Sequence, residues 1–351
     1  MQGDQLADRL GVGPLRVGIV GYGYMGEIRH RSILRQSALE LRGICDPVTG
    51  ASDLGVPLYR SHRELLDAGL DVVFVCTPHN VTADVVVDAL ERGCHVFCEK
   101  PPGRNVADVQ RMIAAEGRAH GRKLMFGFNH RYHQSIQDAK GIIDGGSLGR
   151  LLWMRGVYGK SGGAGFERVW RNVPEISGGG ILLDQGIHML DLFCLFCGDF
   201  EEVIGVTQTS YWDIPVEDNA FVILRNAAGQ VAQLHSSATL WKHTFRLELG
   251  LERGYLVASG ILSRTGSYGR ETLLIGRGDG RGSRPEPREE TVYYEVDPSW
   301  DLQVDQFARS VQEDLPVEES GSREALRVMR IVERVYADAA ARRRSVAEIR
   351  A

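Results

Sequence analysis

The first 130 residues alternate between short apolar runs and longer segments whose apolar side chains have helical spacing. The apolar runs are rich in Val, Ile, Leu and Phe and have the length of buried strands. They span residues 15–20, 40–45, 71–78, 94–100 and 123–130. The segments with helical spacing include residues 81–92 and 106–120. Strands that alternate with helices predict a doubly wound parallel sheet of the α/β class.

After residue 131 the pattern changes. A predicted helix over 135–144 is followed by short segments in which apolar and polar residues alternate. These predicted strands span residues 151–159, 201–209, 219–226, 230–240, 245–252, 254–261, 271–276 and 291–296. Strands without helices between them predict a large, open, mostly antiparallel sheet in an α+β domain. One face of such a sheet is free to meet a second subunit, so we expect a homodimer or homotetramer.

The length of 351 residues favours two domains, and the change of pattern places them at residues 1–130 and 131–351. Residues 277–290 are rich in Gly, Pro and charge and predict a mobile loop between two strands. Amphipathic helices are expected over 300–313 and 322–342. We expect the first of these two helices to pack back onto the N-terminal domain.

Composition excludes some classes of partner. Lys and Arg number 41 against 46 Asp and Glu, so the net charge of −5 offers no basic surface for nucleic acid. Each apolar run is too short to cross a bilayer, and no signal peptide is evident, so we expect a cytoplasmic protein without a membrane partner. The six cysteines lack zinc-type spacing, which predicts reduced thiols and no metal site.

A glycine-rich turn directly follows the first predicted strand. It comprises Gly21, Tyr22, Gly23, Tyr24, Met25 and Gly26. In this G-x-G-x-x-G pattern the glycines permit a tight turn, close approach to a pyrophosphate, and close packing of the next helix. Asp46 lies 20 residues beyond Gly26, where an acid binds ribose hydroxyls and repels a 2′-phosphate. The sequence predicts a Rossmann domain that binds NAD rather than NADP, the alternative being that Asp46 only caps a turn.

Polar residues also stand where the other predicted strands end. Parallel strands direct their carboxyl ends to one edge of the sheet, so these residues are expected at the cofactor crevice. They are Thr77, Pro78, Glu99, Lys100, Pro101 and Asn129. A lysine that ends an apolar strand is partly desolvated and can donate strongly to a substrate oxygen. The alternative for Lys100 is a surface lysine whose ammonium reaches solvent.

The stretch Ser177 to Asp191, SGGGILLDQGIHMLD, is the strongest candidate for the chemistry. Three glycines precede an apolar helix, and residues four apart share one helix face, so Asp184 and His188 are expected side by side. A histidine with a carboxylate neighbour suits general acid/base catalysis. Otherwise Asp184 only favours the helix dipole and His188 is a hydrogen-bonded core residue.

A second glycine-rich segment surrounds Lys160, and Trp170 follows it. A flexible backbone, a cation and an aromatic ring suit a sugar-sized substrate, although a plain surface loop has the same composition.

Taken together, Glu99-Lys100-Pro101 and the G-G-G-x-x-x-D-x-G-x-H-x-x-D pattern of residues 178–191 resemble the Gfo/Idh/MocA family of NAD(P)-dependent sugar and cyclitol oxidoreductases. The resemblance covers nearly the whole chain. It implies a Rossmann domain followed by an open sheet used for oligomerisation. It also implies that Lys100, Asp184 and His188 serve the active site.

Two further positions follow from the resemblance. Arg131 lies in a segment that fits the family's entry into the second domain, where it positions substrate or ties the domains together. Thr82 stands where the family often has a histidine, which leaves the contacts of that loop open.

The implied reaction is hydride transfer between nicotinamide and a ring carbon that carries a secondary alcohol or ketone. His188 would carry the hydroxyl proton, Lys100 would polarise the same oxygen, and Asp184 would orient His188 or bind a neighbouring hydroxyl. Which of His188 and Lys100 is the main proton carrier stays open. We expect a sugar or nucleotide-sugar substrate. The alternatives are an inositol, a redox-neutral NAD-dependent glycosidase and a non-catalytic NAD-binding sensor.

Overall fold

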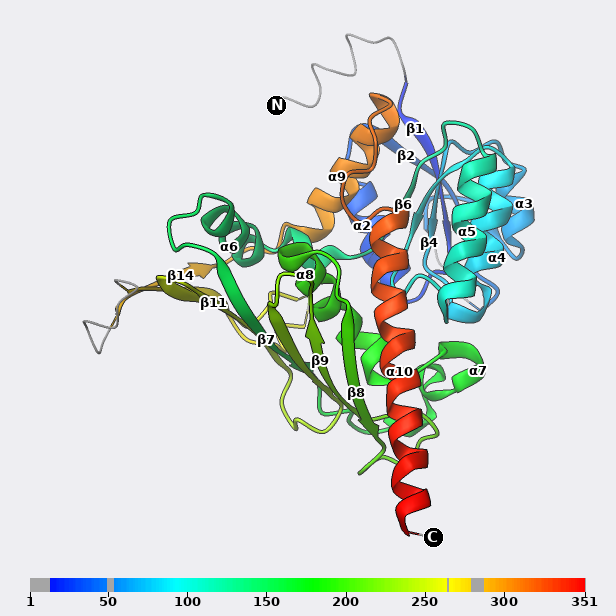
Figure 1. Ribbon diagram of the computed structural model, residues 1–351. Coiled ribbons are helices and arrows are strands. Elements are labelled where there is room, and N and C mark those ends of the chain that lie inside the picture. Colours follow the sequence, from blue (N-terminus) through cyan, green and yellow to red (C-terminus); the bar gives the residue numbers. More distant parts are fainter. Residues whose placement is uncertain (1–12, 49–53, 264, 279–286, 351) are drawn as a thin grey trace. The chain divides into compact units, whose positions relative to one another are not determined.

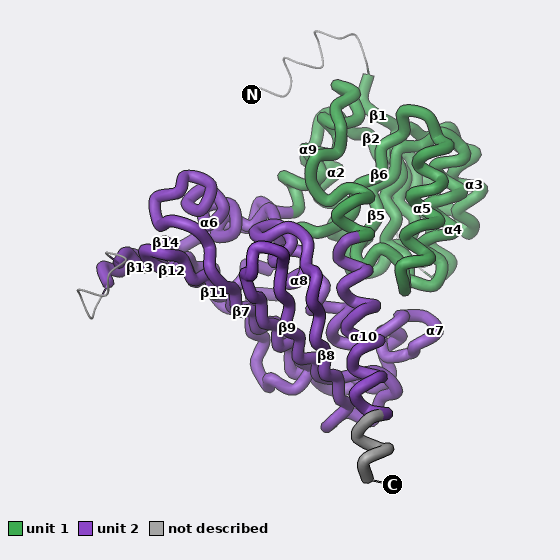
Figure 2. The backbone as a smooth tube through the Cα atoms, viewed as in Figure 1, with its two compact units in different colours: residues 1–129, 300–326 green, residues 130–299, 327–351 purple. Residues whose placement is uncertain are grey.

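The computed structural model describes residues 13–48, 54–263, 265–278 and 287–350. By its internal contacts the chain divides into two compact units (Figure 2). Unit 1 holds residues 1–129 and 300–326, and unit 2 holds residues 130–299 and 327–351. The assignment of residues 300–326 to the second domain was therefore wrong, because the chain returns to the first unit after the strands of the second. The expected packing of the helix near residue 300 onto the first domain agrees with this division.

Unit 1 is built on a six-stranded parallel sheet with the strand order β3-β2-β1-β4-β5-β6 (Figure 1). Its strands are β1 (Leu15–Val20), β2 (Leu39–Cys45), β3 (Leu58–Tyr59), β4 (Val72–Val75), β5 (His95–Cys98) and β6 (Leu124–Phe126). Its helices include α2 (Tyr24–Ile33), α3 (His62–Leu66), α4 (His79–Glu91), α5 (Val106–Arg118) and α9 (Ser299–Gln312). The predicted doubly wound sheet is confirmed. The strand order reverses between β1 and β4, the place where such sheets bind ligands.

The core of unit 1 joins the sheet to the returning helix α9. Phe74 of β4 and Phe97 of β5 stack with ring centroids 5.0 Å apart. Phe307 of α9 meets both rings edge-on, at 6.1 and 5.6 Å. All three side chains are fully buried, and burial of each contributes about 1.5–3 kcal/mol to folding.

Unit 2 is built on an eight-stranded sheet with the order β14-β13-β12-β11-β7-β10-β9-β8. Its strands are β7 (Leu151–Gly159), β8 (Glu202–Gln208), β9 (Asn219–Arg225), β10 (Val231–Ser237), β11 (Thr244–Leu251), β12 (Gly254–Ser259), β13 (Glu271–Arg277) and β14 (Arg288–Tyr294). Neighbours pair antiparallel except β10 with β7, which are parallel. The predicted mostly antiparallel sheet is confirmed.

The predicted loop over residues 277–290 was too long. Strand β13 extends through Arg277 and β14 begins at Arg288, where Arg277 and Arg288 pair across the ladder. Cross-strand pairing with β13 thus makes a strand of charged residues that composition alone assigned to a loop. The remainder of that loop, residues 279–286, lies outside the described residues.

Helices cover one face of the unit 2 sheet. They are α6 (Gln134–Asp144), α8 (Ile187–Cys197) and α10 (Ser322–Arg350). Gly156 of β7 admits α8 closely, because a Cβ at that glycine would lie 2.5 Å from Cγ of Met189. On β8 the Gly205 amide donates to the Asp338 carboxylate of α10 at 2.8 Å. Close packing against β7 therefore fixes the position of α8 on the sheet.

The other face of this sheet presents apolar side chains. Their exposed fractions lie between 38 and 49%. They are Trp153 on β7, Ile204 and Val206 on β8, Phe221 and Ile223 on β9, and Val231 on β10. Cross-strand pairing joins Ile204 to Ile223 and Val206 to Phe221, so the side chains form neighbouring pairs rather than isolated positions.

Within the described residues, the helical stretch Pro174–Cys197 is long and apolar enough to cross a membrane by length and composition alone. Its most apolar window is 72% buried inside the protein. The buried core helix of a folded unit has the same length and apolar composition, and this stretch includes α8, which lies in the core of unit 2.

Candidate active site

The turn between β1 and α2 has the geometry that the glycine pattern predicts. Gly21 has a φ of +90°, and a Cβ there would lie 2.5 Å from the carbonyl oxygen of Cys76. A Cβ at Gly26 would lie 2.3 Å from the carbonyl oxygen of Gly21. At Gly23 nothing lies within 4 Å of the position that a Cβ would take. The backbone thus leaves open space at the N-terminus of α2, where amide groups and the helix dipole favour a phosphate.

Asp46 stands at the end of β2 and links this turn to the next loop. Its Oδ2 accepts the Tyr22 amide at 2.7 Å, and its Oδ1 accepts the Val48 amide at 2.8 Å. Asp46 does cap the local backbone, as the alternative interpretation held. Each carboxylate oxygen can accept a further hydrogen bond, so the cap does not preclude contact with ribose hydroxyls.

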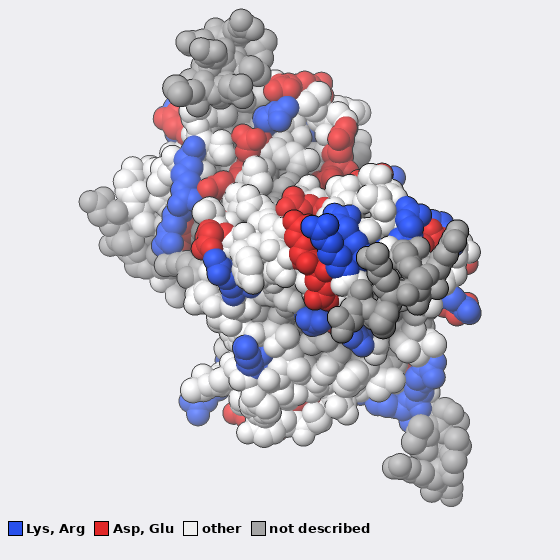
Figure 3. Space-filling model, turned by 90° about the vertical axis from the view of Figure 1, so that its left-hand side faces the viewer, with Lys and Arg blue, Asp and Glu red and all other residues white. Residues whose placement is uncertain are grey.

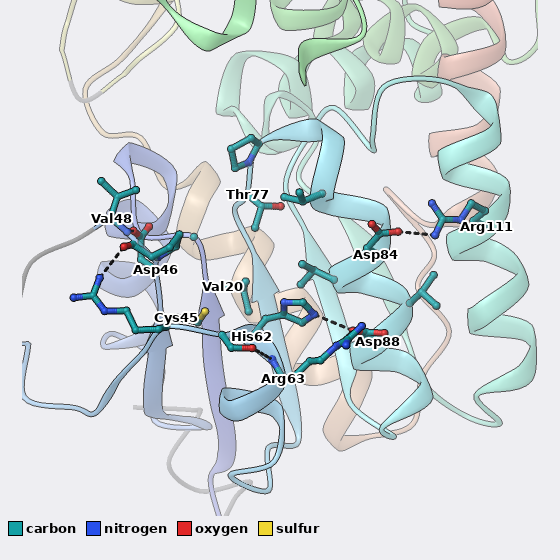
Figure 4. A pocket seen from close by; sticks show the side chains of 18 residues that line it. Val20, Cys45, Asp46, Val48, His62, Arg63, Thr77, Asp84, Asp88 and Arg111 are labelled. Atoms are coloured by element: carbon teal, nitrogen blue, oxygen red, sulfur yellow. Dashed lines mark hydrogen bonds and ion pairs between the residues drawn. The ribbon is translucent and has the colours of Figure 1, made fainter. Parts of the chain in front are cut away.

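A cavity of about 660 Å³ lies within unit 1 beside Gly21 and Asp46, in the size range of small-molecule sites (Figure 4). Figure 4 shows Asp46 on one side of this cavity, and Asp84 and Asp88 on the other. Apolar side chains line it as well, among them Val20, Val48, Val81 and Val85.

The walls of the cavity fit the adenosine half of a dinucleotide. Apolar side chains suit a flat base, and a carboxylate beside them suits ribose hydroxyls. The nearby cations have partners of their own: Arg111 contacts Asp84 at 2.6 Å, and Arg63 and His62 contact Asp88 at 3.0 and 2.9 Å. Together with the open space at Gly23, the residues present fit the cofactor that the sequence predicts.

Thr77 and Pro78 line the same cavity, as their place after β4 predicts. The Thr82 hydroxyl lies 3.0 Å from the hydroxyl of Thr77 and donates to the Pro78 carbonyl at 3.1 Å. Thr82 is 3% exposed. At the position where the family often has a histidine, this chain therefore has a buried hydroxyl that fastens its own loop.

Glu99 has a structural partner that the sequence did not reveal. Its Oε1 receives the Nε of Arg29 at 2.6 Å, and both side chains are almost fully buried. The Arg29 guanidinium also donates to Gln303 of α9 at 2.7 Å and lies over the Phe97 ring at 4.3 Å. The Lys100 amide donates to Oε2 of Glu99 at 3.3 Å. Glu99 is therefore an anchor for the backbone at Lys100, and its predicted cofactor contact stays a prediction.

In unit 2 the candidate catalytic stretch begins as a π-helix, Leu182–Gly186, and continues as α8. Glu217 holds the start of this stretch, because its carboxylate accepts the amides of Gly180 and Leu182, each at 3.0 Å. Its Oε1 also accepts the Tyr336 hydroxyl at 2.9 Å. Burial raises the pKa of Glu217.

Two of the three glycines before this stretch are explained by the same contacts. A Cβ at Gly180 would lie 2.2 Å from the carbonyl oxygen of Glu217, and a Cβ at Gly179 would lie 2.2 Å from the hydroxyl of Tyr336. Glycine lets the chain pass this close to the backbone of Glu217 and to the side chain of Tyr336.

Asp184 lies in the π-helical turn and is held by two cations. Nζ of Lys160 contacts its Oδ2 at 2.7 Å, and Nε of Arg171 lies 3.4 Å from its Oδ1. The Arg171 guanidinium in turn lies over the Trp170 ring at 4.4 Å. The structure thus brings together three predicted site residues, Lys160, Trp170 and Asp184, through Arg171, which follows Trp170 in the sequence.

His188 is 3% exposed and stacks on a second histidine that sequence reasoning missed. The rings of His188 and His130 are 3.7 Å apart and 16° from parallel. Nε2 of His130 lies 3.0 Å from the hydroxyl of Tyr158. The ring of Tyr268 lies 5.5 Å from that of Tyr158, and its hydroxyl accepts the Gln185 amide at 2.7 Å. Burial raises the pKa of Tyr268 to about 12, so this hydroxyl stays protonated at neutral pH.

Arg131 forms a buried ion pair within unit 2. It donates to both oxygens of Asp191 at 2.7 and 2.6 Å, and the two side chains are 4 and 1% exposed. Asp191 lies one turn of α8 beyond His188. This buried bidentate pair fixes α8, and the predicted substrate contact of Arg131 stays a prediction.

The predicted site residues therefore fall on both units. Unit 1 carries the glycine turn, Asp46 and Lys100. Unit 2 carries the cluster of Asp184 and His188.

On the face shown in Figure 3, acidic and basic side chains are interspersed.

Unit 1 is a doubly wound sheet with a glycine turn, and unit 2 carries candidate acid/base residues on a helix that packs on its sheet. This combination is typical of a dinucleotide-dependent oxidoreductase. The chain belongs to the Gfo/Idh/MocA family. The family model for the NAD-binding Rossmann fold matches residues 15–128, and the model for the GFO/IDH/MocA C-terminal domain matches residues 136–257. The predicted family, the NAD cofactor and the oxidoreductase class are confirmed.

Curated relatives and solved structures agree with this assignment. The chain is 29% identical over 248 residues to the D-glucoside 3-dehydrogenase of Escherichia coli K12. The aligned region covers 66% of this chain and 70% of that protein. It is 30% identical over 187 residues to the inositol 2-dehydrogenase of Salmonella typhimurium LT2, about half of each chain (51 and 53%). A structure of levoglucosan dehydrogenase with NADH and L-sorbose has the same fold, with a TM-score of 0.81, 20% identity, and coverage of 94 and 97%.

Proposed function

We propose that this chain is an NAD-dependent dehydrogenase that transfers a hydride between nicotinamide and a secondary alcohol or ketone on a sugar or nucleotide-sugar ring. The observation that carries the proposal is the cluster in unit 2. A carboxylate held by two cations lies four residues from a buried, stacked histidine on the same helical stretch. The names of the relatives support a polyhydroxylated ring as the substrate class, since they act on a glucoside and an inositol.

The side chains divide the work by their chemistry. His188 takes the proton of the reacting hydroxyl in oxidation and returns it in reduction. The Lys100 ammonium donates to the same oxygen and stabilises its developing negative charge. Bound NAD supplies the hydride acceptor.

Of the two roles that the resemblance implies for Asp184, the proposal takes the binding of a neighbouring hydroxyl. With Lys160 at 2.7 Å and Arg171 at 3.4 Å, it presents a carboxylate between two donors. Such a set both accepts from and donates to vicinal hydroxyls, which is what a ring with several hydroxyl groups requires. Asp184 therefore binds a neighbouring hydroxyl and fixes the ring, while its predicted contact with His188 stays a prediction.

The test is NADH formation when the purified protein and NAD meet a panel of glucosides, free sugars, nucleotide sugars and inositols, with products analysed by mass spectrometry. A product two mass units lighter than its substrate, matched by NADH, supports the proposal. Release of an aglycone without NADH would instead identify the redox-neutral glycosidase. If the protein neither cleaves a glycoside nor transfers a hydride in either direction, the remaining alternative is a non-catalytic NAD-binding sensor.

Two substitutions assign the roles within a dehydrogenase. Lys100→Ala and His188→Ala should each lower kcat at least ~100-fold, the scale of lost acid/base or electrostatic assistance, and leave NAD affinity nearly unchanged. The variant that flattens the pH profile of kcat identifies the main proton carrier. Near-normal turnover in either variant would refute the role assigned to that residue.

We also propose that the chain forms a homodimer or homotetramer through the apolar face of the unit 2 sheet. Six apolar side chains on four adjacent strands are 38–49% exposed on that face. Contiguous exposed apolar patches of this kind mark interaction surfaces, and a self-complementary sheet face suits a two-fold interface.

A further inference from the structure

Unit 2 carries an exposed aromatic cluster that the proposed reaction does not use. Tyr211 is 63% exposed and Trp241 is 59% exposed, and their rings meet edge to face at 4.7 Å. Trp212 lies 5.1 Å from Tyr211 and 6.3 Å from Trp241. We call these three residues the aromatic platform. Trp212 is partly buried, whereas the other two rings are exposed. Rings this large are usually buried, so two exposed rings in contact need an explanation.

The platform is held rigidly. The carboxylate of Asp218, which is fully buried, accepts the backbone amides of Ser210, Tyr211 and Trp212 at 2.8–3.1 Å. Burial raises the pKa of Asp218, but these amides more than offset it, so the net pKa lies below its usual value. The indole Nε1 of Trp212 donates to the carbonyl oxygen of Ala238 at 2.9 Å. These contacts fix the backbone at Tyr211 and the indole of Trp212 before any ligand arrives.

Trp241 occupies an unfavourable backbone conformation. Its φ of +56° lies in the left-handed region, which bulky residues rarely adopt. Burial of the side chain does not compensate, since 59% of it faces solvent. Backbone strain at an exposed aromatic residue is typical of binding sites, because the strained conformation orients the ring for a ligand.

The platform is continuous with the Asp184 cluster. The Lys160 ammonium, which contacts Asp184 at 2.7 Å, also lies 5.4 Å from the centre of the Phe166 ring. Phe166 in turn lies 5.0 Å from Trp212. The backbone gives a second connection, because the Leu240 amide donates to the Lys160 carbonyl at 3.3 Å. Trp241 is the next residue after that hydrogen bond.

The chemistry of this arrangement fits a carbohydrate better than a second protein chain. A pyranose ring has an apolar C–H face and a polar rim, and amphipathic Tyr and Trp side chains match the two. Lys160 and Arg171 beside the aromatic rings supply donors for that rim. The apolar face of the sheet, in contrast, has the larger hydrophobic patch that a subunit would cover.

We propose that the aromatic platform is a subsite for the second sugar ring of a glycoside whose first ring is oxidised beside Asp184 and His188. This inference rests on the proposed dehydrogenase function and narrows its substrate class. The substrate is then a disaccharide-like glycoside rather than a free sugar or an inositol.

The experiment compares cellobiose with methyl β-D-glucoside, which offers the same first ring without a second. In the wild-type protein kcat/KM should favour cellobiose. Trp241→Ala and Tyr211→Ala should each lower the ratio of the two kcat/KM values about 10-fold, the scale of one lost aromatic contact. Trp241→Phe should recover part of the ratio. Tyr293→Ala removes another exposed aromatic side chain of unit 2, on β14, and should leave the ratio unchanged.

Three results would overturn the inference. The first is a ratio that Trp241→Ala does not change, or an equal loss with both glucosides. The second is dissociation of an oligomer in Trp241→Ala, measured by light scattering, because the platform would then be a subunit contact. The third comes from calorimetric binding of cellobiose to the protein with NADH: no binding, or equal affinity in wild type and Trp241→Ala.

The calorimetric arm does not depend on turnover. If no glucoside reduces NAD, the proposed dehydrogenase function fails, while weaker cellobiose binding in Trp241→Ala still supports the subsite.

Discussion

The buried ion pair of Arg29 and Glu99 makes unit 1 sensitive to a single substitution. Arg29→Met keeps an apolar stem against the Phe97 and Trp300 rings, which lie 4.3 and 4.9 Å from the guanidinium carbon. It removes the cation that contacts Glu99 at 2.6 Å, and Glu99 is only 6% exposed. The carboxylate is then left buried without its charge partner.

The magnitude follows from the burial of both partners. Loss of one partner of a buried ion pair costs about 3–5 kcal/mol of unfolding free energy, because the remaining charge is uncompensated. Replacing both partners by neutral groups of similar size costs much less and is often neutral. Arg29→Met should therefore lose about 3–5 kcal/mol, and the double variant with Glu99→Gln should recover at least about 2 kcal/mol of it.

Urea unfolding of the full chain, followed by circular dichroism and tryptophan fluorescence, measures both variants. With an m-value of about 3 kcal/mol per M, the single variant should unfold at about 1–1.7 M less urea. Glu99→Gln alone completes the double-mutant cycle. Equal losses in Arg29→Met and in the double variant would refute the reasoning, since neutralising Glu99 would then recover none of the lost free energy.

Three further predictions concern cofactor choice, acid stability and assembly. Asp46→Ala should raise the KM for NAD and improve the use of NADP relative to NAD; an unchanged preference in steady-state kinetics would remove the argument from the carboxylate. Burial and Arg122 lower the pKa of His95 from 6.5 to about 4, so below pH 6.5 the unfolded chain binds the extra proton and stability is lost as pH falls towards 4, by about 3 kcal/mol in all. His95→Asn keeps an acceptor for the Lys123 amide and should flatten this part of the stability profile, whereas an unaltered slope would contradict the assignment. Phe221→Glu should convert the expected dimer or tetramer to a smaller species in light scattering, and a wild-type monomer or an unaffected oligomer would exclude the sheet face as the interface.

The parts of the fold that the sequence predicts well are those set by local pattern. Buried strands between amphipathic helices leave few arrangements other than a doubly wound sheet, so the first unit followed from its apolar runs. The glycine turn could also be predicted residue by residue, because each glycine answers a separate steric demand that the structure shows at Gly21 and Gly26. The short pair β3 and α3 escaped prediction, since a two-residue strand has no periodicity.

The partners of the site residues could not be predicted, because they come from distant parts of the chain. Lys160 reaches Asp184 across 24 residues, and His130 reaches His188 across 58. The π-helical turn that carries Asp184 is flanked by the contacts of Glu217 and Tyr336, neither of which belongs to a local motif. Helical spacing predicted a contact between Asp184 and His188, which stays a prediction, and it gave no indication of the two cations that hold Asp184.

These long-range contacts explain why the proposed proton carrier sits on the most buried helix of unit 2. The catalytic stretch is fixed at three places: by Glu217 at its start, by the seat of Met189 on Gly156, and by Arg131 at Asp191. Acid/base catalysis requires a side chain held within about half an ångström of its working position. A surface helix with a free histidine would not meet that requirement. The buried ion pairs and close glycine contacts accordingly fix the position of His188. Variants at Arg131 or Gly180 should therefore lower kcat before they affect NAD binding in unit 1.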